Sequence, residues 1–319
     1  MTERGRVLWA DLAVLGVAVV WGASYPIAKG ALAHAPVLVL IFYRFVVTAL
    51  AMSAIARREI LAAAPRDLAA GAVLGAILCA IFLAETWGVA MTSATNAALI
   101  ISLCTLLTPL IEFGLRRRLP PAGILLGAGI AIAGVGLVAG GLDRLGMGDF
   151  LILVAAGLRA VMVVATKRLM ADRAIGSAAL TAVQAGTVGT LTLALVLTGY
   201  SGESGGGELI VGAGLPFWAA VGFLSLFCTI AAFYVQNAAI RHTSPTRVSF
   251  LMGTEPLFGV LLARALLAET ASPATIAGTG LILGGTFLGL LAERQVPRGP
   301  AQTTLSRGSQ PPAHRAEAP

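Results

Sequence analysis

This sequence carries little charge. Only 12% of its 319 residues are Asp, Glu, Lys or Arg, and 57% are hydrophobic, whereas soluble domains carry about 25% charged residues. With a mean hydropathy of +0.89, the chain has too little polar surface to cover a water-facing globule, so lipid must be the solvent for most of it. The apolar runs are long and continuous instead of alternating in short segments, which excludes a β-barrel.

The sequence also lacks the motifs of common enzyme, metal and cofactor sites. Its 3 cysteines lie inside apolar runs without metal-type spacing, and we expect them to be small buried hydrophobic residues. No glycine-rich phosphate loop with a following Lys-Ser/Thr is present, and no Ser/His/Asp or Cys/His set stands out. We therefore expect no enzyme and no cofactor. The formal charge of +7 does not indicate nucleic-acid binding, because the basic residues lie in the gaps between apolar runs.

What the chain does contain is ten apolar spans, each of about 20 residues and able to cross roughly 30 Å of hydrocarbon. If the N-terminus lies in the cytoplasm, most of the 22 Lys and Arg fall on the inner side, as the positive-inside rule requires. We predict an all-α polytopic membrane protein with both termini cytoplasmic, in the cell (inner or plasma) membrane. The spans are expected at 9–33, 36–56, 68–91, 96–115, 121–141, 148–170, 177–200, 216–240, 246–267 and 273–292.

The chain is organised around an internal repeat, since the stretch 87–134 comes back as 238–285. Each half holds five spans, an odd number, so the two copies enter the membrane from opposite sides. Inverted repeats of this kind are typical of secondary transporters, whose halves rock about a site near the midplane. At one offset of 151 residues the copies match at Thr92/Thr243, Ser93/Ser244, Gly127/Gly278, Gly129/Gly280 and Gly134/Gly285.

The repeat sets the domain boundaries. We predict a first five-helix repeat over 1–146 and a second over 147–292. The residues 293–319 are polar and rich in Pro, Gly and Ser, which is typical of a disordered tail, here cytoplasmic. Within the spans, Lys29 follows Trp21 by eight residues, and Lys167 follows Arg159 by the same spacing.

Several stretches resemble EamA-type members of the drug/metabolite transporter superfamily, and the likeness covers all ten spans. It implies an inner-membrane carrier with two inverted repeats that moves small metabolites, often amino acids outward, with four helices of each half around a central cavity. Arg159 stands where the family usually has an aromatic residue, which suggests either an anionic substrate or a structural ion pair. The stretches are WGASYPIAK at Trp21–Lys29, YRF at Tyr43–Phe45, TSATNAALI at Thr92–Ile100, TEPLFGVLLARALLAE at Thr254–Glu269 and the final IAGTGLILGG.

Charged groups inside spans are costly and are therefore candidate functional residues. Arg44 or Arg159 could meet a substrate carboxylate, and Glu85 or Glu255 could bind a proton or an amine. The alternative is a structural pair such as Arg44–Glu85. Uncharged polar groups could orient a small ligand or simply hydrogen-bond between helices; these candidates are Ser24, Tyr25, Asn96, Gln184, Tyr234 and Asn237.

Other residues are expected to shape the helices. Pro26, Pro109 and Pro256 interrupt spans and are candidate gating residues, with static bends as the alternative. Glu112 and Arg116 are expected to form a structural i,i+4 pair. Glycines at G-x-x-x-G spacing make the fifth and tenth spans packing elements or a homodimer interface: Gly123/Gly127, Gly136/Gly140, Gly280/Gly284 and Gly285/Gly289.

The predicted function is a secondary transporter that exports small metabolites by alternating access, driven by protons or by the substrate's own gradient. Its expected partners are the small-molecule substrate, the lipid bilayer and, as a candidate coupling ion, the proton. An importer of the same family is the first alternative. A lipid-handling protein or membrane enzyme is less favoured, because the polar residues spread over both halves at mid-depth. A channel would need a carbonyl filter or charged ring, and neither is seen.

Overall fold

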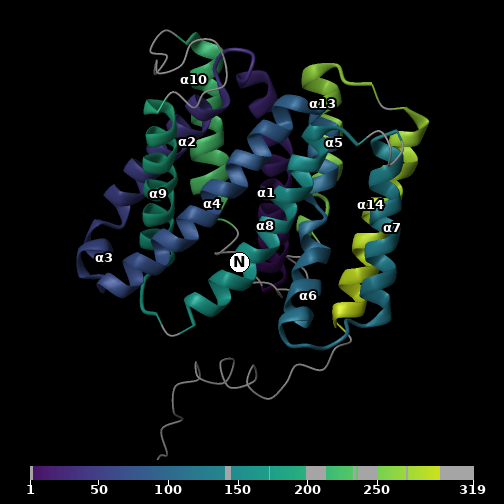
Figure 1. Cartoon of the computed structure of the whole chain (residues 1–319), viewed down its shortest axis with the longest axis horizontal. Coiled ribbons are helices and arrows are strands. Elements are labelled where there is room, and N and C mark those ends of the chain that lie inside the picture. Colours follow the sequence, from purple (N-terminus) through teal and green to yellow (C-terminus); the bar gives the residue numbers. More distant parts are fainter. Residues whose placement is uncertain are drawn as a thin grey trace, which may run out of the picture.

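The structure is a computed structural model that describes residues 3–140, 145–171, 173–198, 213–232, 235, 251–270 and 272–294. The described residues form helices, joined by short turns (Figure 1). The helices are α1 (Glu3–Ala31), α2 (Val37–Ile55), α3 (Arg57–Ala62), α4 (Pro65–Met91), α5 (Ala94–Ile101), α6 (Cys104–Leu115), α7 (Ala122–Val138), α8 (Met147–Leu169), α9 (Ser177–Leu197), α10 (Leu215–Gly222), the π-helical η2 (Phe223–Ala231), α13 (Glu255–Leu267) and α14 (Pro273–Arg294).

The helices are long and apolar enough to identify a multi-pass membrane protein. Among the described residues, seven helical stretches, one of them the α5–α6 run, meet the length and composition of a membrane span, and Ala122–Val138 and Leu215–Ala231 are shorter apolar helices. Large apolar side chains within helices, such as Leu50 of α2 and Leu126 of α7, face outward, as expected for contact with lipid. The predicted all-helical membrane class is thus confirmed. Seven of the ten predicted spans reach full length; the fifth, eighth and ninth correspond to shorter described helices.

The helices pair in a pattern that treats the two halves alike. The second and seventh spans, α2 and α9, pack against each other, and so do the fifth and tenth, α7 and α14 (Figure 1). The third span, α4, packs on the sixth, α8, and the corresponding first span, α1, packs on the eighth, η2. Likewise α1 contacts α13, and its counterpart α8 contacts α6. Exchanging the halves leaves these pairings unchanged, so a two-repeat architecture fits the structure.

The correspondence between the two halves is most exact at the contact between α7 and α14. A Cβ on Gly127 would lie 2.5 Å from the carbonyl oxygen of Gly285, and a Cβ on Gly134 would lie 2.7 Å from that of Gly278. The order of these contacts makes the two helices antiparallel. Gly127 corresponds to Gly278 and Gly134 to Gly285 in the repeat. Exchanging the halves therefore turns one of these contacts into the other, as at a two-fold interface.

The glycines predicted for helix packing are therefore used within the chain. Gly123 faces Ala292, and Gly289 faces Leu106 and Gly127, so the backbones of α7 and α14 approach closely. A homodimer through these helices stays a prediction. It would have to use other faces, such as the one that carries Gly280 and Gly284, beside which there is open space.

The fourth span, predicted as one helix, is broken in the centre of the molecule. It divides into α5 and α6 at Ser102-Leu103. Around the break the backbone switches to three-residue hydrogen bonds, from Leu103 N to Ile100 O and from Leu106 N to Leu103 O. Almost every side chain of α5 is buried, because α1, α4, α7, α8 and α13 surround it. The break therefore lies inside the protein, where its backbone groups are shielded from lipid.

The ninth span is broken at the corresponding position. Residues 253 and 254 form a turn between a helical stretch and α13, and they match Ser102 and Leu103 at the offset of the repeat. The bonds correspond too, because Thr254 N donates to Leu251 O and Leu257 N to Thr254 O. Each half thus contains an interrupted helix, and the two interruptions fall at corresponding positions of the repeat.

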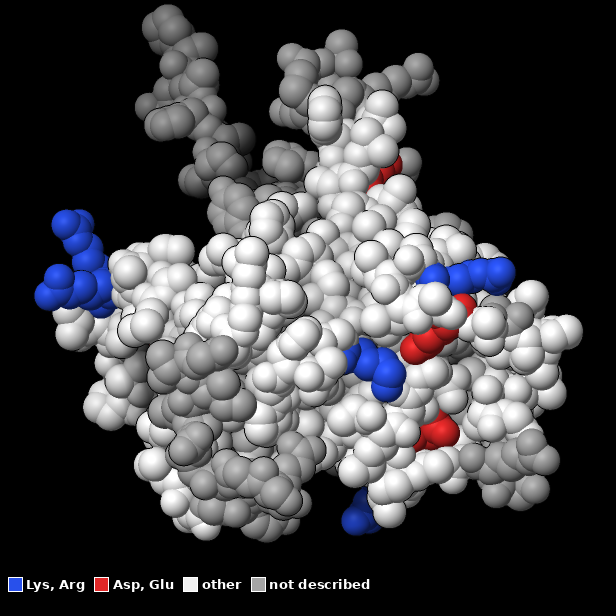
Figure 2. Space-filling model, turned by 90° about the horizontal axis from the view of Figure 1, so that it is seen from above, with Lys and Arg blue, Asp and Glu red and all other residues white. Residues whose placement is uncertain are grey.

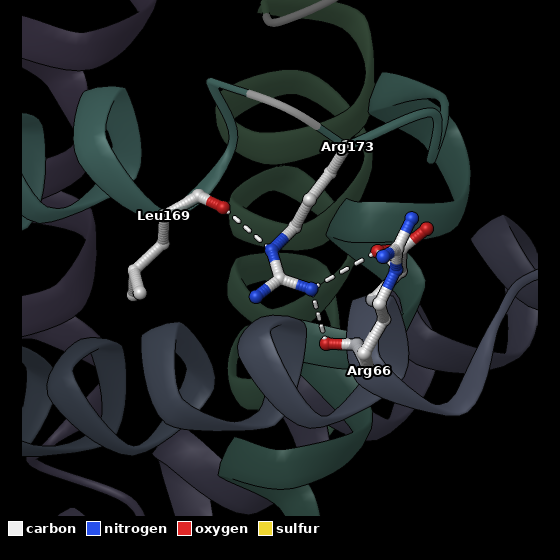
Figure 3. A network of polar contacts seen from close by, with 4 residues as sticks. Arg66, Leu169 and Arg173 are labelled. Atoms are coloured by element: carbon white, nitrogen blue, oxygen red, sulfur yellow. Dashed lines mark hydrogen bonds and ion pairs between the residues drawn. The ribbon is translucent and has the colours of Figure 1, made fainter.

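The N-terminal end of α4 is bonded to the α8–α9 connection (Figure 3). The Arg173 guanidinium donates to the carbonyl oxygens of Leu169 and Arg66, both at 2.6 Å, and to the Asp67 carboxylate at 3.0 Å. Asp67 is buried, so this ion pair is shielded. Nearby, Glu112 accepts from Arg116 at 2.8 Å and from Lys167 at 3.0 Å, which confirms the structural Glu112–Arg116 pair.

Candidate functional site

The two helix breaks line one central pocket. The residues Ile101, Ser102, Cys104 and Thr105 of the first half face Met252, Gly253, Glu255 and Pro256 of the second, which are their counterparts at the offset of 151. Arg159, Leu283 and Thr286 complete the lining. The pocket has a volume of about 50 Å³, which is room for a few water molecules and far below the roughly 300–1,000 Å³ of a ligand site.

Arg159 enters this pocket from α8 and is neutralised by Glu85 of α4. The guanidinium Nε and Nη2 both donate to the same carboxylate oxygen, at 3.1 and 2.7 Å. The Glu85 side chain is only 9% exposed, so the pair is largely desolvated. The expected alternative of an Arg44–Glu85 pair is wrong, because Glu85 is bonded to Arg159. The pair ties the third span to the sixth.

Tyr25 and Glu255 form the second contact of the site. The Tyr25 hydroxyl on α1 donates to Oε1 of Glu255, at the start of α13, at 3.2 Å. Gly22, one turn earlier on α1, lets the two backbones approach, since a Cβ there would lie 2.7 Å from Gly259 N. At 1.5 Å per residue, Glu255 lies about 18 Å from the end of α13, and Arg159 about 18 Å from the start of α8. Both therefore lie at mid-depth.

Arg44 differs from Arg159 because no carboxylate of the described residues forms an ion pair with it. Its guanidinium carbon lies 4.6 Å from the centre of the Phe82 ring and 5.7 Å from that of Phe45. Its buried Nε atom has no hydrogen-bond partner in the described parts of the chain. Arg44 lies close enough to Glu85, Arg159 and Tyr25 to interact with them electrostatically. The structure thus brings together five of the predicted site residues: Tyr25, Arg44, Glu85, Arg159 and Glu255.

The π-helix η2 holds α2 at Arg44. Ser225 of η2 donates to the Arg44 carbonyl oxygen at 3.0 Å. The Thr229 hydroxyl donates to Leu224 O, five residues back, and the indole of Trp21 donates to Cys228 O at 2.7 Å. π-Helical segments are rare and are frequently found at functional sites. Here η2 joins the first, second and eighth spans around Arg44.

At the predicted outer end, side chains from three other segments bind the start of α5 and the turn before it. Asp149 of α8 accepts from the Thr92 hydroxyl and from Asn96 Nδ2, the latter at 3.1 Å. Glu269, after α13, accepts from the backbone N–H groups of Ala94 and Thr95 at 2.8 and 3.0 Å. Lys29 of α1 donates to the carbonyl oxygens of Val89 and Thr92. We call these residues, Lys29, Thr92, Asn96, Asp149 and Glu269, the outer clasp.

Two residues named from the sequence belong to the outer clasp. Asn96 lies at this end and not in the central cluster, and its backbone N–H donates to the hydroxyl of Ser93, the N-cap of α5, at 2.9 Å. Lys29 binds the carbonyl end of α4. Charged side chains are otherwise sparse at this end of the molecule, seen from above in Figure 2.

The remaining predicted residues lie elsewhere. Ser24 and Gln184 make no hydrogen bond through their side chains to the described parts of the chain, and Tyr234 and Asn237 lie outside them. Pro26 is buried within α1 and Pro109 within α6. Pro256, however, stands in the first turn of α13, where its missing N–H costs nothing. The interruptions fall at residues 102–103 and 253–254, so Pro109 lies more than one turn beyond the first and Pro256 directly follows the second.

Sequence reasoning missed several residues that the structure places at the pocket. Ser102 and Gly253 were not considered, and Cys104 was expected to be an ordinary buried residue, although it lines the pocket. One signal could have found them: they occupy matching places in the repeat, next to Glu255, which was already a candidate. Within the described residues, no group of three or more His, Cys, Asp or Glu could hold a metal ion.

These observations define a helical membrane protein built from two related halves around a central polar pocket. The chain matches the EamA-like transporter family over residues 8–140 and again over 146–291, and it belongs to that family, within the drug/metabolite transporter superfamily. No curated protein matches the chain. A solved protein crystal structure matches 90% of this chain and 99% of its own length, with a TM-score of 0.61. At 19% identity, that likeness concerns the fold alone.

Proposed function

We propose that this protein is a secondary transporter of the inner membrane that exports small metabolites by alternating access. In this proposal ten spans form two inverted five-helix repeats, with both termini in the cytoplasm. The observation that carries it is the pocket between two helix breaks at matching positions of the halves. Discontinuous helices at corresponding places mark the substrate site of many secondary transporters, and the antiparallel contact of α7 with α14 supports inversion of the repeats.

Alternating access requires a closure on each side of the pocket, and the outer clasp supplies the first. The repeat indicates the second. Aligning the two lysines, Lys29 with Lys167, also aligns Asp11 with Asp149 without a gap. Asp11 is 8% exposed. The partners of Asp149 in the outer clasp, Thr92 and Asn96, correspond to Thr243 and Arg247. Asp11 is therefore the counterpart of Asp149 in the first half and the candidate residue for the closure on the cytoplasmic side; residues 243 and 247 lie outside the described residues.

The size of the pocket supports a gated carrier over a channel. A volume of about 50 Å³ cannot hold a metabolite, so one clasp must open before a substrate enters. The polar lining, with Arg159 and Glu255 at mid-depth, suits a small polar compound. Export is the direction that the family resemblance implies; an importer would share the same geometry, so direction is tested by comparing initial rates of efflux and uptake.

Filling the pocket tests the function. We expect Ser102→Leu and Gly253→Leu to abolish transport, because a leucine at either break would occupy the space that the substrate needs. The measurement is counterflow: vesicles loaded with an unlabelled mixture of amino acids and carboxylic acids accumulate labelled members of the mixture only through a carrier. Gly280→Leu is the matched control, since nothing lies within 4 Å of a Cβ there. Unchanged counterflow in both pocket variants would contradict the site, and its absence in the parent protein would contradict the function.

A further inference from the structure

We propose that Arg44 is the residue that binds a negatively charged group of the substrate, and that the substrate therefore carries a carboxylate. This inference rests on the proposed transporter function and assigns the substrate class of the same site. Arg44 and Arg159 both lie in the interior of the helices, and within the described residues only Arg159 forms an ion pair.

The guanidinium of Arg159 has both a counterion and hydrogen-bond acceptors in this protein. Its Nε edge, formed by Nε and Nη2, points at the Glu85 carboxylate, which is the side-on geometry in which arginine binds carboxylates strongly. Glu85 thereby loses its availability to Arg44. An Arg159 that is already neutralised has no reason to attract a second anion.

Arg44 presents the same edge with nothing on it. Its Nε is buried and unpartnered, although buried polar groups are almost always hydrogen-bonded. The aromatic face of Phe82 at 4.6 Å supports the flat guanidinium by a cation–π contact. It leaves the edge of the group, where acceptors bind, unoccupied. An intramembrane cation without a counterion is costly, and such residues mark substrate paths.

The surroundings of Arg44 connect it to the pocket. Its electrostatic neighbours include Glu85 and Arg159, and Arg159 lines the pocket. Ser225 and Thr48 both donate to its backbone carbonyl oxygen, at 3.0 and 2.9 Å, so two hydrogen bonds hold the backbone at this position, while the guanidinium is held by its ring contacts. A charged substrate in the pocket would therefore interact with Arg44 as well as with Arg159.

A carboxylate fits this site better than an uncharged group. It can accept from Nε and one Nη together, and it would supply the negative charge that the described surroundings do not supply to Arg44. Removing the guanidinium should weaken carboxylate binding roughly tenfold to hundredfold, from the strength of hydrogen bonds to charged groups. Uncharged analogues should lose little affinity, because the charge of Arg44 contributes little to their binding.

The test compares each carboxylate with its own amide. Thermal midpoints of the purified full-length protein are measured with a panel of α-amino acids, hydroxy acids and dicarboxylates, and with the amides of the same compounds. A ligand that binds the folded state raises the midpoint. We expect at least one carboxylate to raise it more than its amide does, Arg44→Met to abolish that difference, and Arg116→Gln, which removes an equal charge at the surface, to keep it.

A second readout separates binding from structure. Without ligand, Arg44→Met should leave the midpoint unchanged or raise it by a few degrees, since replacing a buried charge by an apolar side chain of similar volume is often stabilising. A fall in this midpoint below that of Arg116→Gln would make Arg44 structural and overturn the proposal. So would a carboxylate effect that survives in Arg44→Met, or a panel in which no carboxylate exceeds its amide.

These results are distinguishable from a failure of the transporter function. If carboxylates stabilise the protein through Arg44 and counterflow is absent, the anion site stands and the carrier proposal falls. If counterflow occurs with uncharged compounds alone, the carrier stands and the anion site is refuted.

Discussion

Arg159→Gln should destabilise the protein by about 3–5 kcal/mol, the cost of leaving one partner of a buried ion pair without the other. The variant leaves the Glu85 carboxylate, whose side chain is 9% exposed, without a counterion in the interior of the protein. Thermal midpoints in detergent should fall by roughly 5–10 °C. Because unfolding of a membrane protein is often irreversible, midpoints are compared at one heating rate.

The double variant Arg159→Gln/Glu85→Gln distinguishes pairing from other effects. Two amides can hydrogen-bond without a net buried charge, so most of the lost stability should return. Glu85→Gln alone should cost less than Arg159→Gln, because the Arg159 side chain is 31% exposed and reaches the pocket. If the double variant is as unstable as the sum of the single variants, the pair does not hold the third and sixth spans together.

Gly127→Val and Gly285→Val should each cost about 3 kcal/mol, the upper end of the range for overpacking. A Cβ on either glycine would lie 2.5 Å from the other's carbonyl oxygen. Backbone atoms on both sides cannot turn aside as a side chain could, so the two helices must separate. Size-exclusion profiles and thermal midpoints measure the loss, and we expect much of each variant to aggregate.

The matched controls lie on the same helices. Gly129→Val and Gly280→Val introduce the same side chain at the exposed pair of corresponding positions, where nothing lies within 4 Å of the new Cβ. These two variants should keep normal profiles and midpoints. Equal damage at all four positions would show that valine disturbs the helices themselves, and the close contact between α7 and α14 would not be needed.

Much of the fold could be predicted from the sequence because the membrane imposes a simple rule. Long apolar runs must be helices, since each backbone group needs a partner inside the segment. The gap between the predicted spans 68–91 and 96–115 agrees with the structure, where α4 ends at Met91 and Ser93 caps α5. The repeat then correctly indicated two related halves, and the family match over two stretches agrees.

The break in the fourth span could not be predicted in the same way. Residues 101–105, Ile-Ser-Leu-Cys-Thr, contain neither glycine nor proline, so nothing local ends the helix there. The interruption depends on the helices around α5, which bury it almost completely. Pro109, six residues after Leu103, was the predicted interruption because proline is the usual cause of a kink.

Pairing of the intramembrane charges was likewise beyond the sequence. Arg44 and Arg159 were equal candidates, and Glu85 could have bonded either one. Arg159 is 74 residues from Glu85, and only the packing of α4 on α8 decides in its favour. The charged residues of the central cluster were nevertheless predicted as candidates, because a charge inside an apolar span is costly and is usually functional.

The most direct test of the account uses the thiol of Cys104, which lines the pocket, while Cys79 and Cys228 are buried. Asp149→Ala should weaken the outer clasp, and Asp11→Ala its predicted cytoplasmic counterpart. A membrane-impermeant maleimide, applied to right-side-out and inverted vesicles, reports which side of the pocket is open. We predict faster labelling of Cys104 from outside in Asp149→Ala and from the cytoplasmic side in Asp11→Ala. Labelling that changes on the same side in both variants, or in neither, would contradict a central pocket opened alternately by two related halves.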